Sequence, residues 1–233
     1  MSVILAIETA TKMCSVALSR GEELLAIKEE GGEYSHAENL NGFIQEVLDK
    51  ANLKLSTIDA IAISKGPGSY TGLRIGVSTA KGLCYSLNKP LISVDTLQAM
   101  AKKALLELSK EEMGEHVLLC PMIDARRMEV YTSIYEQNGA QIIPVEAKII
   151  NEHSFSDLLK KNKIYFFGDG ASKCKEVLSK QPNAVFIDSI ETSAQFVNEL
   201  AFQKFQQQIV EDVAYFEPYY LKDFIATTPK KLL

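Results

Sequence analysis

The sequence predicts an α/β protein of two lobes, each a mixed β-sheet with flanking helices. The main observation is that one order of elements, three strand-like runs followed by a helix, a strand, a second helix and a last strand, occurs twice along the chain. The length agrees, because 233 residues exceed one modest domain and suit two lobes of about 100 residues each. With 46% apolar and 24% charged residues, the chain can bury an ordinary globular core. We expect a first lobe at residues 1–105 and a second at residues 106–233.

The first half opens with three strand-like runs. Val3–Ile7 is a continuous apolar run that fits a buried strand, and a polar turn at residues 8–12 separates it from Cys14–Leu18. A second turn at residues 20–21 leads to Leu24–Ile27. Together the runs predict an antiparallel meander of three strands.

An amphipathic helix follows this meander. Ser35 and Glu38 have the spacing of a capping box, and apolar residues recur at helical period as far as Lys50. The half is completed by a short buried strand at Ile58–Ser64, a loop at Lys65–Tyr70, a helix from about Thr71 to Leu87 and a strand at Leu91–Val94.

The second half repeats this order after a helix around Thr96–Ser109. Val117–Ile123 is a buried strand, Glu129–Tyr135 alternates like a strand, and Asn138–Gly139 is a hairpin signal before Gln141–Ile150. The half is completed by a helix near Ser154–Lys161, a strand at Ile164–Phe167, a glycine turn at Gly168–Gly170, a helix at Ser172–Ser179 and a strand at Val185–Asp188.

The duplicated order is similar to that of the ribonuclease-H-like lobes in the actin, Hsp70 and sugar-kinase superfamily. The match is one of element order, because no residue-level repeat joins the two halves. A last helix at about Ser193–Gln207 and the tail Tyr219–Leu233 have no evident counterpart in the first half. We expect these segments to pack back on the first lobe or to carry a contact of their own.

Two segments resemble one family of this superfamily. Ser64–Leu83, with the sequence SKGPGSYTGLRIGVSTAKGL, and Asp124–Tyr131, with the sequence DARRMEVY, are close to hallmarks of the TsaB (YeaZ) family of bacterial tRNA threonylcarbamoyladenosine biosynthesis. That family is paralogous to the catalytic subunit TsaD. The resemblance is strong over residues 1–96, clear at residues 124–131 and 167–171, and thin from residue 172 onward.

Three turns correspond to those that hold a nucleotide between the lobes in this superfamily. The turn at residues 8–12 has an acid and hydroxyls but no glycine that would let backbone N–H groups approach a phosphate, and the turn at residues 124–127 carries bulky arginines. The turn at residues 168–170 has an anion-tolerant form at a helix start, but a plain tight turn between a strand and a helix is the favoured interpretation. The candidate cleft or nucleotide-proximal residues are Glu8, Thr9, Lys12, Asp124, Arg126, Glu129, Gly168, Asp169 and Gly170.

The charged residues of the second turn allow two interpretations. Asp124, Arg126 and Glu129 form either a buried ion-pair network that braces the hairpin or part of the interlobe cleft or of a partner interface. The sequence leaves both open.

The helix at residues 71–87 has an unusual bare stripe. Gly72, Gly76 and Ala80 lie four residues apart, and each interior glycine costs a helix about 1 kcal/mol relative to alanine. Such a stripe predicts close packing against the Ser35–Lys50 helix or against a partner subunit. The family resemblance implies that these two helices form the surface for homodimerisation and for pairing with TsaD. The residues expected to carry it are Leu40, Phe43, Val47, Leu73, Gly76, Val77, Ala80 and Leu83.

Several function classes find no support in the sequence. The net charge is −5 and basic residues form no stripe, which disfavours direct tRNA binding. The three histidines lie far apart, so no His-x-x-x-His metal pair exists. Neither a Gly-x-Ser-x-Gly elbow nor a Walker A motif is present. The four cysteines are widely spaced and predict reduced, mostly buried thiols. We therefore expect no catalytic residue and no metal ligand.

The resemblance implies a non-catalytic partner of TsaD that acts with the ATPase TsaE. Together they transfer threonylcarbamoyl to the adenosine next to the tRNA anticodon, and this subunit meets tRNA only indirectly. The resemblance also implies a homodimer in isolation and no cofactor of its own, and it leaves open a nucleotide, ATP or ADP, at a subunit junction. The sequence shows no signal-peptide pattern and no apolar run long enough to span a membrane, so we expect a cytoplasmic protein. The alternatives are a glycoprotease-like hydrolase and a small kinase or ATPase of the same fold.

Overall fold

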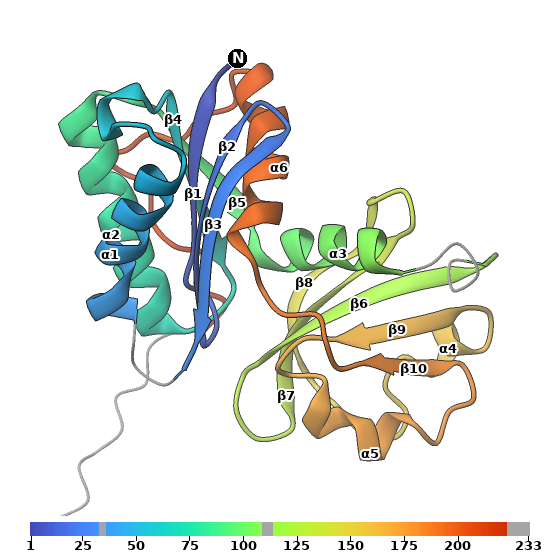
Figure 1. The fold of residues 1–233 in the computed structure, drawn as a ribbon. Coiled ribbons are helices and arrows are strands. Elements are labelled where there is room, and N and C mark those ends of the chain that lie inside the picture. Colours follow the sequence, from blue (N-terminus) through green and yellow to red (C-terminus); the bar gives the residue numbers. More distant parts are fainter. Residues whose placement is uncertain (33–35, 109–113, 223–233) are drawn as a thin grey trace, which may run out of the picture.

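A computed structural model describes residues 1–32, 36–108 and 114–222 of the chain. It contains two five-stranded sheets in two lobes (Figure 1). Ser35, part of the expected capping box, and residues 223–233 of the expected tail lie outside the described residues.

The first sheet has the strand order β3-β2-β1-β4-β5. Its central strand β1 is antiparallel to β2 and parallel to β4, with Ile7 paired to Val16 on one side and to Ile63 on the other. β1 is buried along its whole length, as expected for a continuous apolar run covered on both faces. The strands are β1 (Val3–Glu8), β2 (Met13–Arg20), β3 (Glu23–Gly31), β4 (Ala60–Gly66) and β5 (Leu91–Asp95).

Helices cover both faces of the first sheet (Figure 1). α1 (His36–Lys50) and α2 (Tyr70–Leu87) pack on one face over Leu5 and Ile7, and α6 (Ala194–Gln206) packs on the other over Ile4 and Ala6. A short 3-10 helix, η1 (Leu55–Thr57), precedes β4. Successive side chains of a strand point to opposite faces, so β1 contributes to both cores.

The second sheet repeats the first in topology. Its order is β10-β9-β6-β7-β8, with β6 antiparallel to β7 and parallel to β9. The predicted fold class is therefore confirmed, although the helices expected near residues 154–161 and 172–179 are shorter than predicted. The elements are β6 (Val117–Asp124), β7 (Glu129–Glu136), β8 (Gln141–Ile149), α4 (Ser156–Leu159), β9 (Lys163–Phe167), η2 (Ser172–Cys174), α5 (Lys175–Leu178) and β10 (Ala184–Ile187).

The last helix of each half packs on the sheet of the other half. α3 (Thr96–Glu107) follows β5 and lies on the second sheet, where Leu97 and Met100 join the core around Leu119. α6 follows β10 and lies on the first sheet, where Val197 joins the core around Ile4. The expectation that the last helix has no counterpart is thus wrong, because α3 holds the equivalent position.

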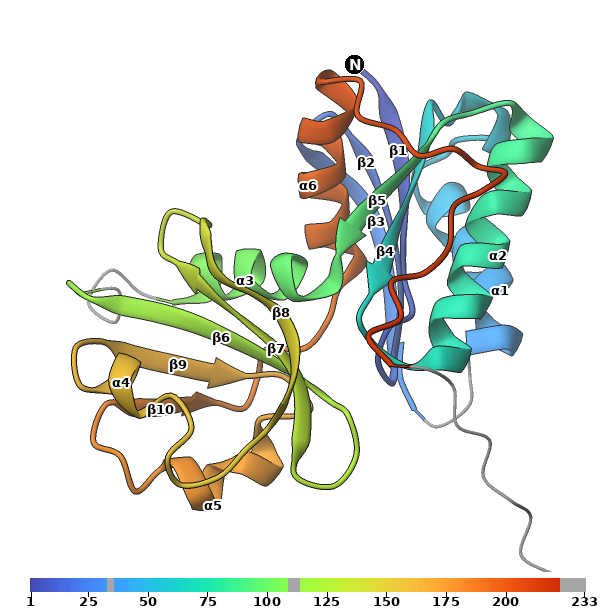
Figure 2. The same cartoon turned by 180° about the vertical axis from the view of Figure 1, so that it is seen from behind.

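The segment after α6 returns along the first lobe (Figure 2). Its backbone N–H at Glu211 donates to the Leu91 carbonyl at 2.8 Å, and that at Tyr219 donates to the Lys65 carbonyl at 2.7 Å. Between these points the Lys81 ammonium donates to the Phe216 carbonyl at 2.9 Å. The chain is thereby held along β5 and α2 and reaches the edge of the interlobe cleft.

Two other sequence expectations concern membranes and thiols. Within the described residues, every helix is too short or too polar to cross a bilayer. All four cysteines are free and buried, as predicted.

Candidate functional site

Two cavities lie where the lobes meet. The first, of about 470 Å³, is lined by the β1–β2 turn, the start of α1, the start of α2 and the turns after β6 and β9, and we term it the turn cavity. The second, of about 450 Å³, is lined by residues 67–71, by the β6–β7 hairpin and by residues 219–222 of the C-terminal segment, and we term it the tail cavity. Asp124 and Arg126 line both, so the β6–β7 turn separates the two spaces.

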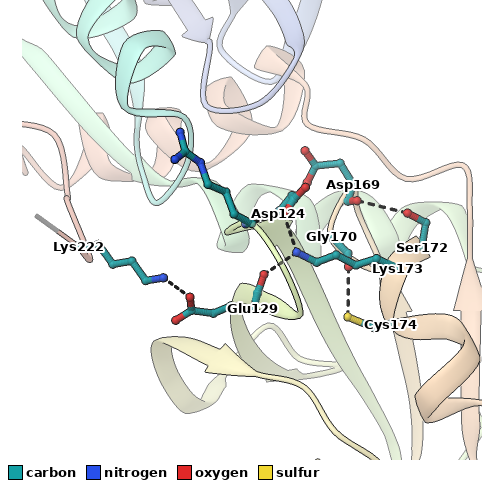
Figure 3. A network of polar contacts seen from close by, with 9 residues as sticks. Asp124, Glu129, Asp169, Gly170, Ser172, Lys173, Cys174 and Lys222 are labelled. Carbon is teal, nitrogen blue, oxygen red and sulfur yellow. Dashed lines mark hydrogen bonds and ion pairs between the residues drawn. The ribbon is translucent and has the colours of Figure 1, made fainter. Parts of the chain in front are cut away.

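Asp124 is the centre of a polar network at this turn (Figure 3). Its Oδ1 accepts a hydrogen bond from the Arg126 backbone N–H at 2.7 Å and pairs with the Lys173 ammonium. Its own N–H donates to Asp169 Oδ1 at 3.0 Å. Although partial burial acts in the opposite direction, the bond to Lys173 keeps the pKa of Asp124 below its ordinary value. Asp124 is therefore ionised and already engaged.

The glycine turn after β9 packs tightly against β6. A Cβ atom on Gly168, which has φ +98°, would collide with the Met122 carbonyl, and one on Gly170 would meet the backbone of Ile123. The Gly170 N–H donates to the Met122 carbonyl at 3.0 Å. These contacts favour the plain tight-turn interpretation, because the glycines are needed for close approach and this N–H already has a partner. Asp169 lines the turn cavity, and burial raises its pKa.

Glu8 and Thr9 lie inside the first lobe and line neither cavity. Glu8 Oε1 accepts from the Ala10 N–H at 2.6 Å, while Oε2 has no hydrogen-bond partner among the described residues. Complete burial raises the pKa of Glu8 to about 7. Thr9 Oγ1 donates to the Gly72 carbonyl at 2.8 Å. Of the candidate residues in this turn, only Lys12 lines the turn cavity.

The charged side chains of the β6–β7 turn do not pair directly with one another, although the Lys173 ammonium joins Asp124 to the Glu129 backbone carbonyl, to which it donates at 2.6 Å. Glu129 pairs with Lys222 of the C-terminal segment, whereas Asp124 pairs with Lys173 (Figure 3). Within the described part of the chain, the Arg126 guanidinium makes no hydrogen bond or ion pair. This geometry favours the cleft interpretation over an internal Asp–Arg–Glu brace.

Some cleft residues were not predicted from the sequence. His36 lines the turn cavity, with Nε2 2.7 Å from the Thr11 carbonyl oxygen and Nδ1 buried without a partner among the described residues. Tyr219, Tyr220 and Lys222 line the tail cavity, but nothing in the local sequence indicates where the segment after α6 returns.

The side chains expected to form a partner interface are core residues of the first lobe. Gly76 and six other members of the set are buried within this single chain, and Leu83 is half-buried. The glycines of the stripe pack mainly against the β1–β2 turn, because a Cβ atom on Gly72 or Gly76 would collide with Thr9, and one on Gly72 would also lie 3.3 Å from His36 at the start of α1. The buried members are Leu40, Phe43, Val47, Leu73, Gly76, Val77 and Ala80.

The outer surface of α1 and α2 consists of different residues. Gly42 and Gln45 on α1 and Ser78 and Gly82 on α2 are exposed, and a Cβ atom on Gly42 or Gly82 would meet nothing within 4 Å. Tyr85 is 87% exposed. The pair of helices therefore presents small and polar residues to solvent.

Metal chemistry has no support among the described residues, where no group of three or more histidine, cysteine, aspartate or glutamate side chains could hold an ion. Hydroxyl groups and the Arg126 side chain line both cavities, and tyrosine rings line the tail cavity. Such groups bind and orient a ligand.

Comparison with known proteins places the chain in a family. A curated relative from Haemophilus influenzae, "tRNA threonylcarbamoyladenosine biosynthesis protein TsaB", is 31% identical over 98% of this chain and 96% of its own length. The chain belongs to the TsaB (YeaZ) family. The family model described as "TsaD: tRNA N6-adenosine threonylcarbamoyltransferase" matches residues 29–233, which indicates that TsaB and TsaD proteins share a common origin.

Solved structures agree with this family. A Pseudomonas aeruginosa protein described as similar to peptidase YEAZ has a TM-score of 0.76 and 26% identity, covering 95% of this chain and 100% of its own. The activator of 2-hydroxyisocaproyl-CoA dehydratase from Clostridium difficile, solved with bound ADPNP, has a TM-score of 0.51 at 9% identity, covering 90% and 98%. The second likeness, at this low identity, shows a shared fold alone.

Proposed function

We propose that this chain is a non-catalytic subunit in the biosynthesis of tRNA threonylcarbamoyladenosine. In this role it pairs with TsaD, is joined by the ATPase TsaE, and supports transfer of threonylcarbamoyl to the adenosine beside the anticodon. The observation that carries the proposal is the end-to-end match to a protein named for this biosynthesis. The site geometry is consistent with it, because the acid of each nucleotide-type turn is buried or paired within the chain.

The pairing surface in this proposal is the outward side of α1 and α2. It includes Gly42, Gln45, Ser78 and Gly82, which are exposed. Small side chains let a second helix pair approach closely, and the half-buried Ile75 and Leu83 add apolar area beside them. The same surface serves a homodimer of the isolated chain, so self-association and pairing with TsaD compete.

Complex formation tests this proposal. The purified chain is mixed with TsaD of the same organism and analysed by size-exclusion chromatography with light scattering, with and without ATP or ADP. A defined heterodimer is expected. Absence of a complex under every condition would contradict the proposal.

A matched pair of variants locates the surface. Ser78→Arg places a large charged side chain at an exposed position on α2 and is expected to abolish the heterodimer. Ser179→Arg makes the same exchange at an exposed position just after α5 in the second lobe and is expected to leave the heterodimer intact. Equal behaviour of the two variants would refute the assignment of the α1–α2 surface.

Activity tests the non-catalytic role. The chain alone, supplied with ATP, threonine, bicarbonate and tRNA, is expected to form no threonylcarbamoyladenosine, whereas addition of TsaD and TsaE is expected to yield the modified nucleoside by mass spectrometry. Formation of threonylcarbamoyladenosine by this chain alone would contradict the non-catalytic role. Peptide hydrolysis or substantial ATP turnover by the isolated chain would contradict it as well.

A further inference from the structure

The tail cavity has a chemical character that the proposed function leaves unused. Its walls come from three segments far apart in sequence, the loop before α2, the β6–β7 hairpin and the C-terminal segment. Four tyrosines line it, namely Tyr70, Tyr131, Tyr219 and Tyr220, together with the guanidinium-bearing Arg126. The C-terminal segment contributes residues 219–222 to this lining.

Arg126 lines this cavity, and among the described residues its guanidinium has no hydrogen bond or ion pair. The nearby acids are already paired, Asp124 with Lys173 and Glu129 with Lys222. Each of these two pairs is neutral, so Arg126 adds a positive charge to the lining, and Arg74, which donates to the Tyr70 hydroxyl at 2.9 Å, lies beside it. The planar fork of donors on a guanidinium matches the two oxygens of a carboxylate or phosphate.

The backbone holds Arg126 in an unfavourable conformation. Its φ is +71°, and the following Arg127 has φ +48°, a region that non-glycine residues seldom adopt. The Asp124 carboxylate fixes the turn through the bond from the Arg126 N–H at 2.7 Å. Backbone strain of this kind is frequent at ligand sites, where the surrounding structure maintains it.

The tyrosine rings supply flat apolar surface next to this charge. Tyr70 and Tyr220 pack together with ring centroids 5.0 Å apart, and Tyr219 and Tyr220 are still 41% and 38% exposed. The wall is anchored, because the Tyr219 N–H donates to the Lys65 carbonyl at 2.7 Å. Exposed aromatic faces beside a cation suit a planar ring that bears a negative group.

We propose that the tail cavity binds a small ligand composed of a planar ring and one anionic group, with the anion on Arg126 and the ring against the tyrosines. A volume of about 450 Å³ lies within the range of small-molecule sites. Among the charged residues of the lining, Asp124 and Lys222 are each engaged in an ion pair, so Arg126 offers a place for one anionic group. This inference goes beyond the proposed function and does not depend on it, because the isolated chain contains the whole site.

Isothermal titration of the isolated chain tests the proposal with two probes. AMP presents a phosphate and phenylacetate presents a carboxylate, so the tighter binder identifies the anion. Arg126→Met is expected to weaken binding of that probe at least tenfold, the loss typical of a charge-assisted bond. Arg127→Met is the matched control, since Arg127 is exposed, has the same backbone strain and lines neither cavity; its affinity is expected to stay within twofold of the parent chain.

A second pair of variants distinguishes the two cavities. Tyr219→Ala alters only the tail cavity and keeps the backbone anchor, whereas Lys12→Met alters only the turn cavity. Weaker binding in Tyr219→Ala with unchanged binding in Lys12→Met supports the proposal. The reverse pattern, equal effects of the two arginine variants, or no saturable binding of either probe at millimolar concentration would overturn it, while TsaD pairing would remain unaffected.

Discussion

Replacement of Glu8 by glutamine should make the protein less sensitive to alkaline pH. Glu8 is fully buried at the end of β1, with Oε2 unpartnered among the described residues. Burial raises its pKa from the ordinary 4.5 to about 7, and the hydrogen bond from the Ala10 N–H only partly offsets this effect. The neutral carboxyl is therefore the form that suits the folded lobe.

The sign of the effect follows from proton linkage. Between pH 4.5 and pH 7 the folded state binds more protons at Glu8 than the unfolded state does, so the free energy of unfolding falls as pH rises. The loss is complete above pH 7 and amounts to about 3 kcal/mol, because each tenfold step in the dissociation constant is worth about 1.4 kcal/mol. At pH 5 less than about 1 kcal/mol of this loss has developed.

Urea unfolding at pH 5 and pH 8 measures this difference. Glu8→Gln keeps the shape of the neutral carboxyl and is expected to gain about 2–3 kcal/mol more stability, relative to the parent chain, at pH 8 than at pH 5. Glu46→Gln is the control, because Glu46 lies at the surface and its bond to Lys50 lowers its pKa. A gain from Glu8→Gln that is the same at both pH values would refute the reasoning.

Three further outcomes follow from the packing and charges. Gly76→Ala should lower the free energy of unfolding by about 1–3 kcal/mol through overpacking against Thr9. Gly82 has open space around it, so Gly82→Ala should raise the free energy of unfolding by up to about 1 kcal/mol. The midpoints of denaturant unfolding curves compare the two variants. All four thiols are buried, and burial raises the pKa of Cys84 to about 12, so dithionitrobenzoate at pH 8 should react slowly with the native chain and rapidly in denaturant. Lys173→Met should raise the pKa of the Asp124 carboxyl, which a carbon-detected NMR titration would follow; an unchanged pKa would contradict its pairing with Lys173.

The order of strands and helices was predictable because it follows from the local spacing of apolar residues along the sequence. Continuous apolar runs such as Val3–Ile7 become central strands, and the helical period before Lys50 becomes the buried side of α1. Two elements of the second half were predicted too long, since α4 and α5 have only four residues each. Short helices leave few periodic positions and are easily overestimated from pattern alone.

The candidate site was less predictable, because identical patterns serve different neighbours. An apolar helix face packs equally well on its own sheet or on a partner, and the sequence does not say which. Phe43 and Val77 are core residues, and for this reason we propose the pairing surface on the opposite side of the same helices. The stripe at Gly72 and Gly76 did require close packing, but the close neighbour is Thr9, 63 residues before Gly72. Gly76→Arg would consequently disturb the first lobe itself and is no test of pairing.

The exchange of the last helices also bears on what counts as a lobe. α6 places Ala194, Val197 and Ala201 against the small residues Ala6 and Ala17 of the first sheet, and Asn198 donates to the Ile4 carbonyl at 3.0 Å. A chain cut between residues 105 and 106 would leave this face of the first sheet uncovered, and the second sheet would lose α3. The two sheets are separate, but the core of each sheet includes a helix that follows the other sheet in the chain. The relative position of the two sheets, and with it the cleft and both cavities, therefore depends on three parts of the chain. These are α3, α6 and the C-terminal segment.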